Sequence, residues 1–175
     1  MAPDHTGREF PIAAGIFLGL GLGGFFDGIV LHQVLQWHHM VTSAGYPANS
    51  VHNLEVNTLW DGLFHASTYI FVLLGLIMLW RTVHRTHVRW SGKLLAGTIL
   101  MGFGLFNLVE GIVDHHILGI HHVNETVPAV QWIYWDIGFL IMGAVLLIVG
   151  WLLLKSGQQH TLDEDAITRA GRASR

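Results

Sequence analysis

The sequence predicts an all-α protein, a four-helix transmembrane bundle, and three observations lead to this prediction. Of the 175 residues, 51% are hydrophobic and only 12% are charged, whereas about 25% of the residues in a soluble domain are charged. The hydrophobic residues form long runs, and a run of about 20 crosses a bilayer as a helix. One motif occurs twice, which indicates that the bundle is built from two parallel helix-pair repeats.

Four segments are long and apolar enough to be spans. They cover residues 10–37, 59–80, 93–118 and 129–154. The first is too long for a cleaved signal peptide and contains Asp27, so we expect it to remain as a permanent helix. Residues 1–155 then form one transmembrane domain, with repeats over about 10–83 and 93–155. Residues 156–175 are polar and are expected to be a flexible tail.

The basic residues predict the orientation of the chain. All nine fall before the first span, between the second and third, or after the fourth: Arg8, Arg81, Arg85, Arg89, Lys93, Lys155, Arg169, Arg172 and Arg175. In a four-span topology these positions share one side of the membrane. Because Lys and Arg favour the cytoplasmic side, both termini are expected to be cytoplasmic.

The duplicated motif reads acid-Gly-Ile-Val-x-His-x5-His-His. It covers residues 27–39 in the first span and residues 110–122 in the third, at a constant offset of 83 positions (110 − 27). The second and fourth spans share a weaker match, Trp60-Asp61 against Trp135-Asp136. A duplicated helix pair of the same orientation implies a pseudo-twofold axis along the membrane normal.

Five acids lie within the predicted spans, in the half nearer the non-cytoplasmic face: Asp27, Asp61, Glu110, Asp114 and Asp136. A charge inside a bilayer costs several kcal/mol unless it has a partner, and every Lys and Arg is expected on the opposite side. The chain has 13 histidines and no cysteine. Pairing with histidine, or coordination of a cation by nitrogen and oxygen ligands, is therefore the favoured way to stabilise these acids.

Ideal helix geometry separates the candidate ligands into two stripes. At about 100° per residue, Asp27 and His38 share one stripe, and His32 and His39 share another roughly 120° away. Two adjacent ions, or a cluster on the bundle axis, suit this pattern better than one ion. The glycines beside the acids, Gly28, Gly62 and Gly111, are expected to permit close helix approach.

The candidate metal ligands are the acids and histidines of the repeats and of the second span. They are Asp27, His32, His38, His39, Asp61, His65, Glu110, Asp114, His115, His121 and His122. Asp61 and His65 are spaced i, i+4, which suits shared coordination of one ion. Asp136 fits ligation and simple hydrogen bonding equally well, and His116 points away from both stripes.

Other interpretations of these residues stay open at this point. The acids are also compatible with protonated carboxyl groups in interhelical hydrogen bonds, or with a polar network that holds no metal. The pairs His38-His39 and His121-His122 lie near the predicted surface, where solvated histidines are as compatible with the pattern as ligands are.

The same motifs resemble the bacterial DUF2243 family of membrane proteins. The strings that carry the resemblance are residues 26–39 (FDGIVLHQVLQWHH), 60–66 (WDGLFHA) and 107–116 (NLVEGIVDHH). The resemblance covers nearly the whole chain apart from both tails, and it implies four spans and a bacterial inner (cytoplasmic) membrane location. Members of the family are often encoded near respiratory-oxidase assembly factors. The resemblance therefore points toward metal supply or redox chemistry and toward respiratory-chain partners.

Three functions are compatible with these observations. The first is a membrane metalloenzyme, most plausibly an oxidoreductase, because His and carboxylate ligands suit copper, iron or zinc. The second is acquisition or delivery of a metal for respiratory oxidase assembly. The third is haem binding by His32 and His115, against which the neighbouring acids argue. The expected surroundings are the lipid bilayer, and nothing indicates a nucleic-acid partner.

Overall fold

The structure, a computed structural model, describes residues 10–83, 88 and 90–173, without some side chains beyond residue 160. It contains four long helices, three of which are α1 (Ile12–Phe25), α2 (Val51–Val83) and α3 (Gly92–Glu110). The fourth, α4 (Trp132–Ala173), follows a short 3-10 turn at Ala129–Gln131. Two π-helices, η1 (Phe26–Val34) and η2 (Gly111–Ile117), continue α1 and α3.

The prediction of four apolar spans is confirmed in its number and approximate places. The segments long and apolar enough to cross a membrane are Ile12–Val34, Val51–Val83, Gly92–Ile117 and Ala129–His160. The second begins earlier than residue 59, because the polar residues that precede the apolar run continue the same helix. The first ends at Val34 rather than at residue 37, so the following histidines lie outside a helix.

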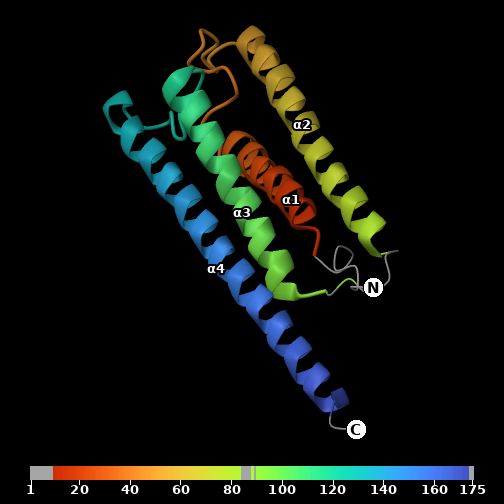
Figure 1. The fold of residues 1–175 in the computed structure, drawn as a ribbon. Helices are drawn as coiled ribbons and strands as arrows, with labels where there is room; N and C mark the ends of the chain where they lie inside the picture. Colours follow the sequence, from red (N-terminus) through yellow and green to blue (C-terminus); the bar gives the residue numbers. More distant parts are fainter. Residues whose placement is uncertain (1–9, 84–87, 89, 174–175) are drawn as a thin grey trace.

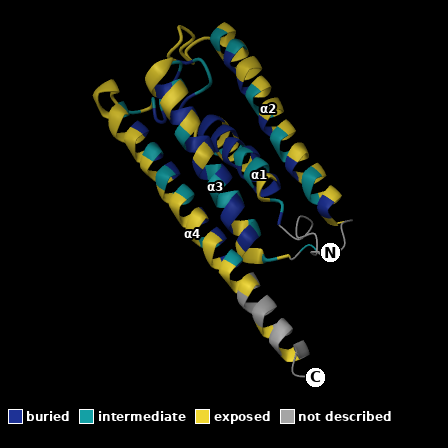
Figure 2. Cartoon of the chain, viewed as in Figure 1, coloured by how far each residue is buried: buried dark blue, intermediate teal, exposed yellow. Residues whose placement is uncertain are grey.

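The helices pack side by side in the order α2, α1, α3, α4 (Figure 1). Within the described part of the chain the backbones of α2 and α4 do not meet, so the four helices form a row and not a closed ring. The central pair, α1 and α3, is therefore more buried than α2 and α4, as Figure 2 shows. In the most apolar stretch, 56% of the α1–η1 span is buried, against 11% of α2. The outer helices therefore present apolar side chains outward, as contact with lipid requires.

Small residues set the spacing of the central pair. A Cβ atom added at Gly19 of α1 would overlap the carbonyl oxygen of Ile99, and one at Gly102 of α3 would overlap that of Ile16. In membranes such contacts between small residues are a main source of helix association. Of the glycines expected to allow close approach, Gly28 and Gly111 do face a neighbouring side chain, but Gly62 faces open space and that expectation was wrong.

The contrast between these glycines predicts a difference in stability. Gly19→Ala is expected to destabilise the protein by about 1–3 kcal/mol, because the added methyl group overpacks the α1–α3 contact. Gly62→Ala is the matched control, and should be neutral or stabilising by up to about 1 kcal/mol through higher helix propensity. Thermal unfolding in detergent micelles measures both. Equal effects of the two substitutions would contradict the close approach at Gly19.

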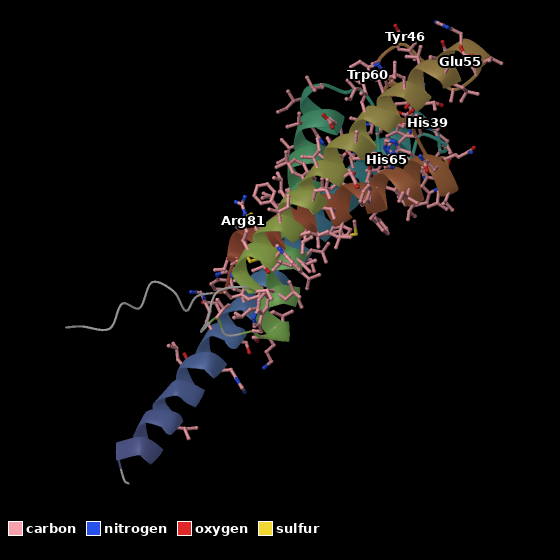
Figure 3. The ribbon with its side chains drawn as sticks, turned by 90° about the vertical axis from the view of Figure 1, so that its right-hand side faces the viewer. His39, Tyr46, Glu55, Trp60, His65 and Arg81 are labelled. Atoms are coloured by element: carbon pink, nitrogen blue, oxygen red, sulfur yellow. The ribbon has the colours of Figure 1, made fainter. Side chains whose placement is uncertain are left out.

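The end of the chain continues the last helix. α4 extends to Ala173, through the segment where the sequence predicts a tail, and its flexibility stays a prediction. Of the basic residues used for orientation, Arg8, Arg85, Arg89 and Arg175 lie outside the described residues, as do the side chains of Arg169 and Arg172. Arg81 and Lys93 lie at the ends of α2 and α3 away from the buried histidines, and Lys155 lies at the same level within α4. Figure 3 shows the separation for Arg81 relative to His39.

Candidate metal centre

Both copies of the duplicated motif adopt a π-helical turn, which corrects the two-stripe arrangement expected for ideal α-helices. The i→i+5 repeat of a π-helix places residues five apart next to each other, and the acid and first histidine of the motif are five apart. His32 Nε2 lies 3.0 Å from Asp27 Oδ2, and His115 Nε2 lies 2.9 Å from Glu110 Oε1. Each half of the protein therefore brings its acid and its first histidine together.

After each π-helix the chain turns back sharply toward the interior. Gln36 and Gly119, which correspond at the same offset (119 − 36 = 83), both have left-handed backbones with φ of 50° and 58°. These turns place His38 and His121 in the interior of the protein, where they are only 2% and 0% exposed. Their rings stack with centroids 4.6 Å apart. These two histidines are thus interior groups and not interfacial ones.

The Nδ1 atoms of His32, His38 and His121 donate to fixed acceptors, whereas His115 Nδ1 has no hydrogen-bond partner within the described residues. His32 Nδ1 donates to Asp61 Oδ1 at 2.8 Å, and His115 Nδ1 lies 3.5 Å from Asp136 Oδ1. His38 Nδ1 donates to the Val123 carbonyl at 2.9 Å. In the matching contact, His121 Nδ1 donates to the Met40 carbonyl at 3.1 Å. A carbonyl oxygen only accepts, so the Nδ1 atoms of His38 and His121 carry a proton, and in the neutral ring the Nε2 atom then carries a lone pair.

The inward atoms lack the hydrogen bonds that buried polar groups normally make. Among the described residues, both oxygens of Asp27, Glu110 Oε2 and the Nε2 atoms of His32, His38 and His115 have no hydrogen-bond partner. His32 Nε2 and Asp27 Oδ2 face each other at 3.0 Å without hydrogen-bond geometry. Two acceptors at that distance repel, so a cation or an additional proton is needed between them.

The spacing of the inward atoms fits a metal ion. In a square-planar or octahedral site, two ligands each about 2.1 Å from the ion and about 90° apart around it are separated by about 3.0 Å. His121 Nε2 lies 2.8 Å from Glu110 Oε1, a contact that is also a hydrogen bond, and the other two acid–histidine pairs lie at 2.9 and 3.0 Å. Two triads have ligand atoms within 4.8 Å of one another: His32, His38 and His121, and Glu110, His115 and His121. The two triads share His121 and contain five residues. We call these five residues together with Asp27 the inner cluster: Asp27, His32, His38, Glu110, His115 and His121.

The electrostatic surroundings keep His38 in the form that binds metals. Burial, reinforced by the adjacent His121, lowers the pKa of His38 well below its ordinary value of 6.5. The imidazole is therefore neutral at physiological pH, and its Nε2 lone pair is available. Only a neutral imidazole coordinates a metal.

Asp61 and Asp136 hold the two turns against the outer helices through matching contacts. Asp61 Oδ1 accepts from the Met40 backbone amide at 2.9 Å, and Asp61 Oδ2 accepts from His39 Nδ1 at 2.7 Å. Asp136 Oδ1 accepts from the Val123 amide at 3.0 Å, and Asp136 Oδ2 accepts from His122 Nδ1 at 2.7 Å. The two aspartates thus orient the histidines that surround the inner cluster, a role that carboxylates take around metal sites.

The remaining candidate residues lie around the cluster. His39 and His122 have side chains 17% and 23% exposed and face the loop end of the molecule. His65 stacks on Phe25 and packs against Gly28, with a buried Nε2 that has no partner within the described residues. The half-buried Asp114 carboxylate makes no hydrogen bond to the described residues. The structure therefore brings six of the predicted ligands together, with Asp61, His39 and His122 as their direct neighbours or anchors.

An open cleft of about 840 Å³ leads from the loop end toward the inner cluster. His38 forms part of its lining, together with His39 and His122. Across the two loops, Glu125 Oε1 accepts from Ser43 Oγ at 2.6 Å and from the His122 amide at 3.0 Å. Sequence reasoning gave no role to Glu125; its position three residues after the second His-His pair is the signal that it belongs to this region.

Comparison with known proteins places the chain in a family. No curated protein and no solved structure matches it. The model of DUF2243, described as a predicted membrane protein, matches residues 14–157. That range contains every residue of the inner cluster as well as Asp61 and Asp136. The chain therefore belongs to the DUF2243 family of predicted membrane proteins.

Proposed function

We propose that this protein is an integral membrane metalloprotein that binds metal ions in the inner cluster. The observation that carries the proposal is the arrangement of the four buried histidines. His32, His38 and His121 each donate Nδ1 to an anchoring oxygen, and His115 Nδ1 lies 3.5 Å from Asp136 Oδ1. The Nε2 atoms of the four rings lie near a carboxylate or another ring of the cluster. Hydrogen bonding of the outer nitrogen to a carboxylate or carbonyl is typical of metal-bound histidine. Without a cation or an additional proton, the facing lone pairs would carry a large cost in a buried site.

The proposed centre is multinuclear, with one position in each of two parallel helix-pair repeats. The matching contacts of Asp61 and Asp136, and the reciprocal bonds from His38 and His121 to the opposite loop, support a duplicated site. The halves are unequal. Glu110 reaches both His115 and His121, whereas Asp27, one methylene shorter, contacts His32.

Copper, iron and zinc are the metals that the donor atoms suit. All donors are imidazole nitrogen and carboxylate oxygen, and the chain has no cysteine. Such sites bind copper(II), iron and zinc, whereas copper(I) favours thiolate and thioether ligands. Carboxylate and histidine ligands projecting from helices also hold two metal ions in di-iron proteins, which is the basis for proposing an oxidoreductase.

Metal acquisition or delivery is the second candidate, favoured by the open cleft that reaches His38. Haem binding has less support. The His121 ring lies between the two proposed axial ligands, with centroids 5.8 Å from His32 and 4.9 Å from His115. A porphyrin would need that space.

The proposed setting is the bacterial inner membrane, with both termini cytoplasmic and the inner cluster near the opposite face. The separation of Arg81, Lys93 and Lys155 from the cluster along the helices supports this orientation, because basic residues favour the cytoplasmic side.

Elemental analysis of the protein purified in detergent tests the proposal. We expect about two equivalents of copper, iron or zinc, one for each triad position. A resident redox centre should keep its metal against a chelator for hours and change its optical spectrum on reduction, whereas a delivery protein should exchange its metal within minutes. Less than a tenth of an equivalent after reconstitution with each metal would refute metal binding.

A further inference from the structure

The inner cluster is enclosed on the sides formed by the helices. Asp27, His32 and His121 are 1%, 0% and 0% exposed, and Glu110 and His115 are also buried. A hydrated metal ion can therefore reach these atoms only through an opening. The 840 Å³ cleft at the loop end is such an opening, because its lining includes His38, a member of the His32–His38–His121 triad.

The chemistry of the cleft lining favours cations. Glu125 contributes a carboxylate, and His38, His39 and His122 contribute imidazoles. The lining contains no Lys or Arg. Because Asp61 and Asp136 accept from Nδ1 of His39 and His122, the Nε2 atom is the one that carries a lone pair when either ring is neutral. A wall of carboxylate oxygen and imidazole nitrogen provides successive ligands for a divalent cation that is losing water.

The two walls of the cleft are joined by a short link between the loops. Ser43 Oγ and the His122 amide both donate to Glu125 Oε1, and the Ser43 amide donates to the Ile120 carbonyl at 3.0 Å. The Glu125 amide donates to the Trp37 carbonyl at 2.9 Å. These bonds hold together the two loops that carry His39 and His122, both of which line the cleft.

We infer that this cleft is the loading route for a divalent metal ion, along which His39, His122 and Glu125 bind the ion transiently before it reaches His38. This inference rests on the proposed function, because it assumes that the inner cluster binds metal. It assigns the cleft to cation passage and not to binding of an anionic substrate, because the described lining contains the Glu125 carboxylate and neither Lys nor Arg.

A charge series at one position of the cleft wall tests the route. Ala48 lines the cleft and is exposed, and the structure gives it no hydrogen bond within the described residues. With Co²⁺ as a spectroscopic probe and apo-protein in uncharged detergent, Ala48→Lys should slow metal uptake by about fivefold and Ala48→Glu should speed it by a similar factor. Ala48→Gln gives the rate for a neutral side chain of similar size. The final Co²⁺ stoichiometry should be unchanged in all three.

Two controls separate the route from general effects of charge. Val130→Lys adds the same charge at the same end of the molecule, at an exposed position outside the cleft lining, and should change the rate much less. The differences in the Ala48 series should nearly vanish in 1 M salt, where the Debye length is about 3 Å. Uptake rates independent of the charge at residue 48, with normal stoichiometry, would overturn the route alone. Absence of Co²⁺ binding in every variant and in the unmodified protein would instead overturn the proposed function.

Discussion

His121→Ala is expected to remove tight metal binding, with an affinity loss of about 100-fold or more relative to the unmodified protein. His121 belongs to both triads, so its loss leaves each with only two of its three ligands. It also leaves the Met40 carbonyl without its donor and removes the stacking partner of His38. Elemental analysis and competition titration against a chelator of known affinity measure the change.

A matched substitution and a rescue distinguish ligation from loss of structure. His52→Ala removes an exposed histidine at the same end of the molecule and should leave metal content unchanged. Imidazole added to His121→Ala should restore part of the metal binding, because it supplies the missing nitrogen in the cavity. Full metal content in His121→Ala, or loss of equal size in His52→Ala, would contradict the assignment. Helix content by circular dichroism shows whether the variant is folded.

The membrane class and the number of helices follow from the sequence because they depend on composition and length alone. Apolar runs of 20 or more residues leave little choice of structure in a bilayer, where every backbone group must be bonded within its own helix. The order in which the helices pack could not be predicted from the sequence. It depends on which small residues face which helix, and Gly62, placed beside Asp61 just as Gly28 is beside Asp27, faces outward.

For the candidate site, the sequence predicted the residues but not their arrangement in space. The duplication identified the six residues of the inner cluster, but a 100° wheel separated Asp27 from His32 because it assumes α-helical geometry. The π-helical turn removes that separation, and the acid-x4-His spacing of both repeats is its one sequence signal. The anchors of His38 and His121 are the backbone carbonyls of Val123 and Met40, which no side-chain pattern can reveal.

Asp61→Asn and Asp136→Asn are expected to weaken metal binding by about 10–100-fold each, although neither belongs to a triad. Each carboxylate accepts from one backbone amide and from the Nδ1 atom of His39 or His122. In addition, Asp61 accepts from His32, and Asp136 lies 3.5 Å from His115. An asparagine has one acceptor oxygen, so its amide nitrogen would oppose a donor. Glu55→Gln, an exposed carboxyl on the same helix as Asp61, is the control and should have no effect.

The pair of substitutions also distinguishes one ion from two. If each repeat holds its own ion, each single variant should keep one tight equivalent and lose the other in a calorimetric titration. The double variant should then lose both. If a single ion is shared through His121, each single variant should lower the affinity of the only equivalent, and the double variant should lower it further. Metal affinity unchanged in both single variants would show that the aspartates merely hold the loops, because hydrogen bonds that orient ligands must change the affinity of those ligands.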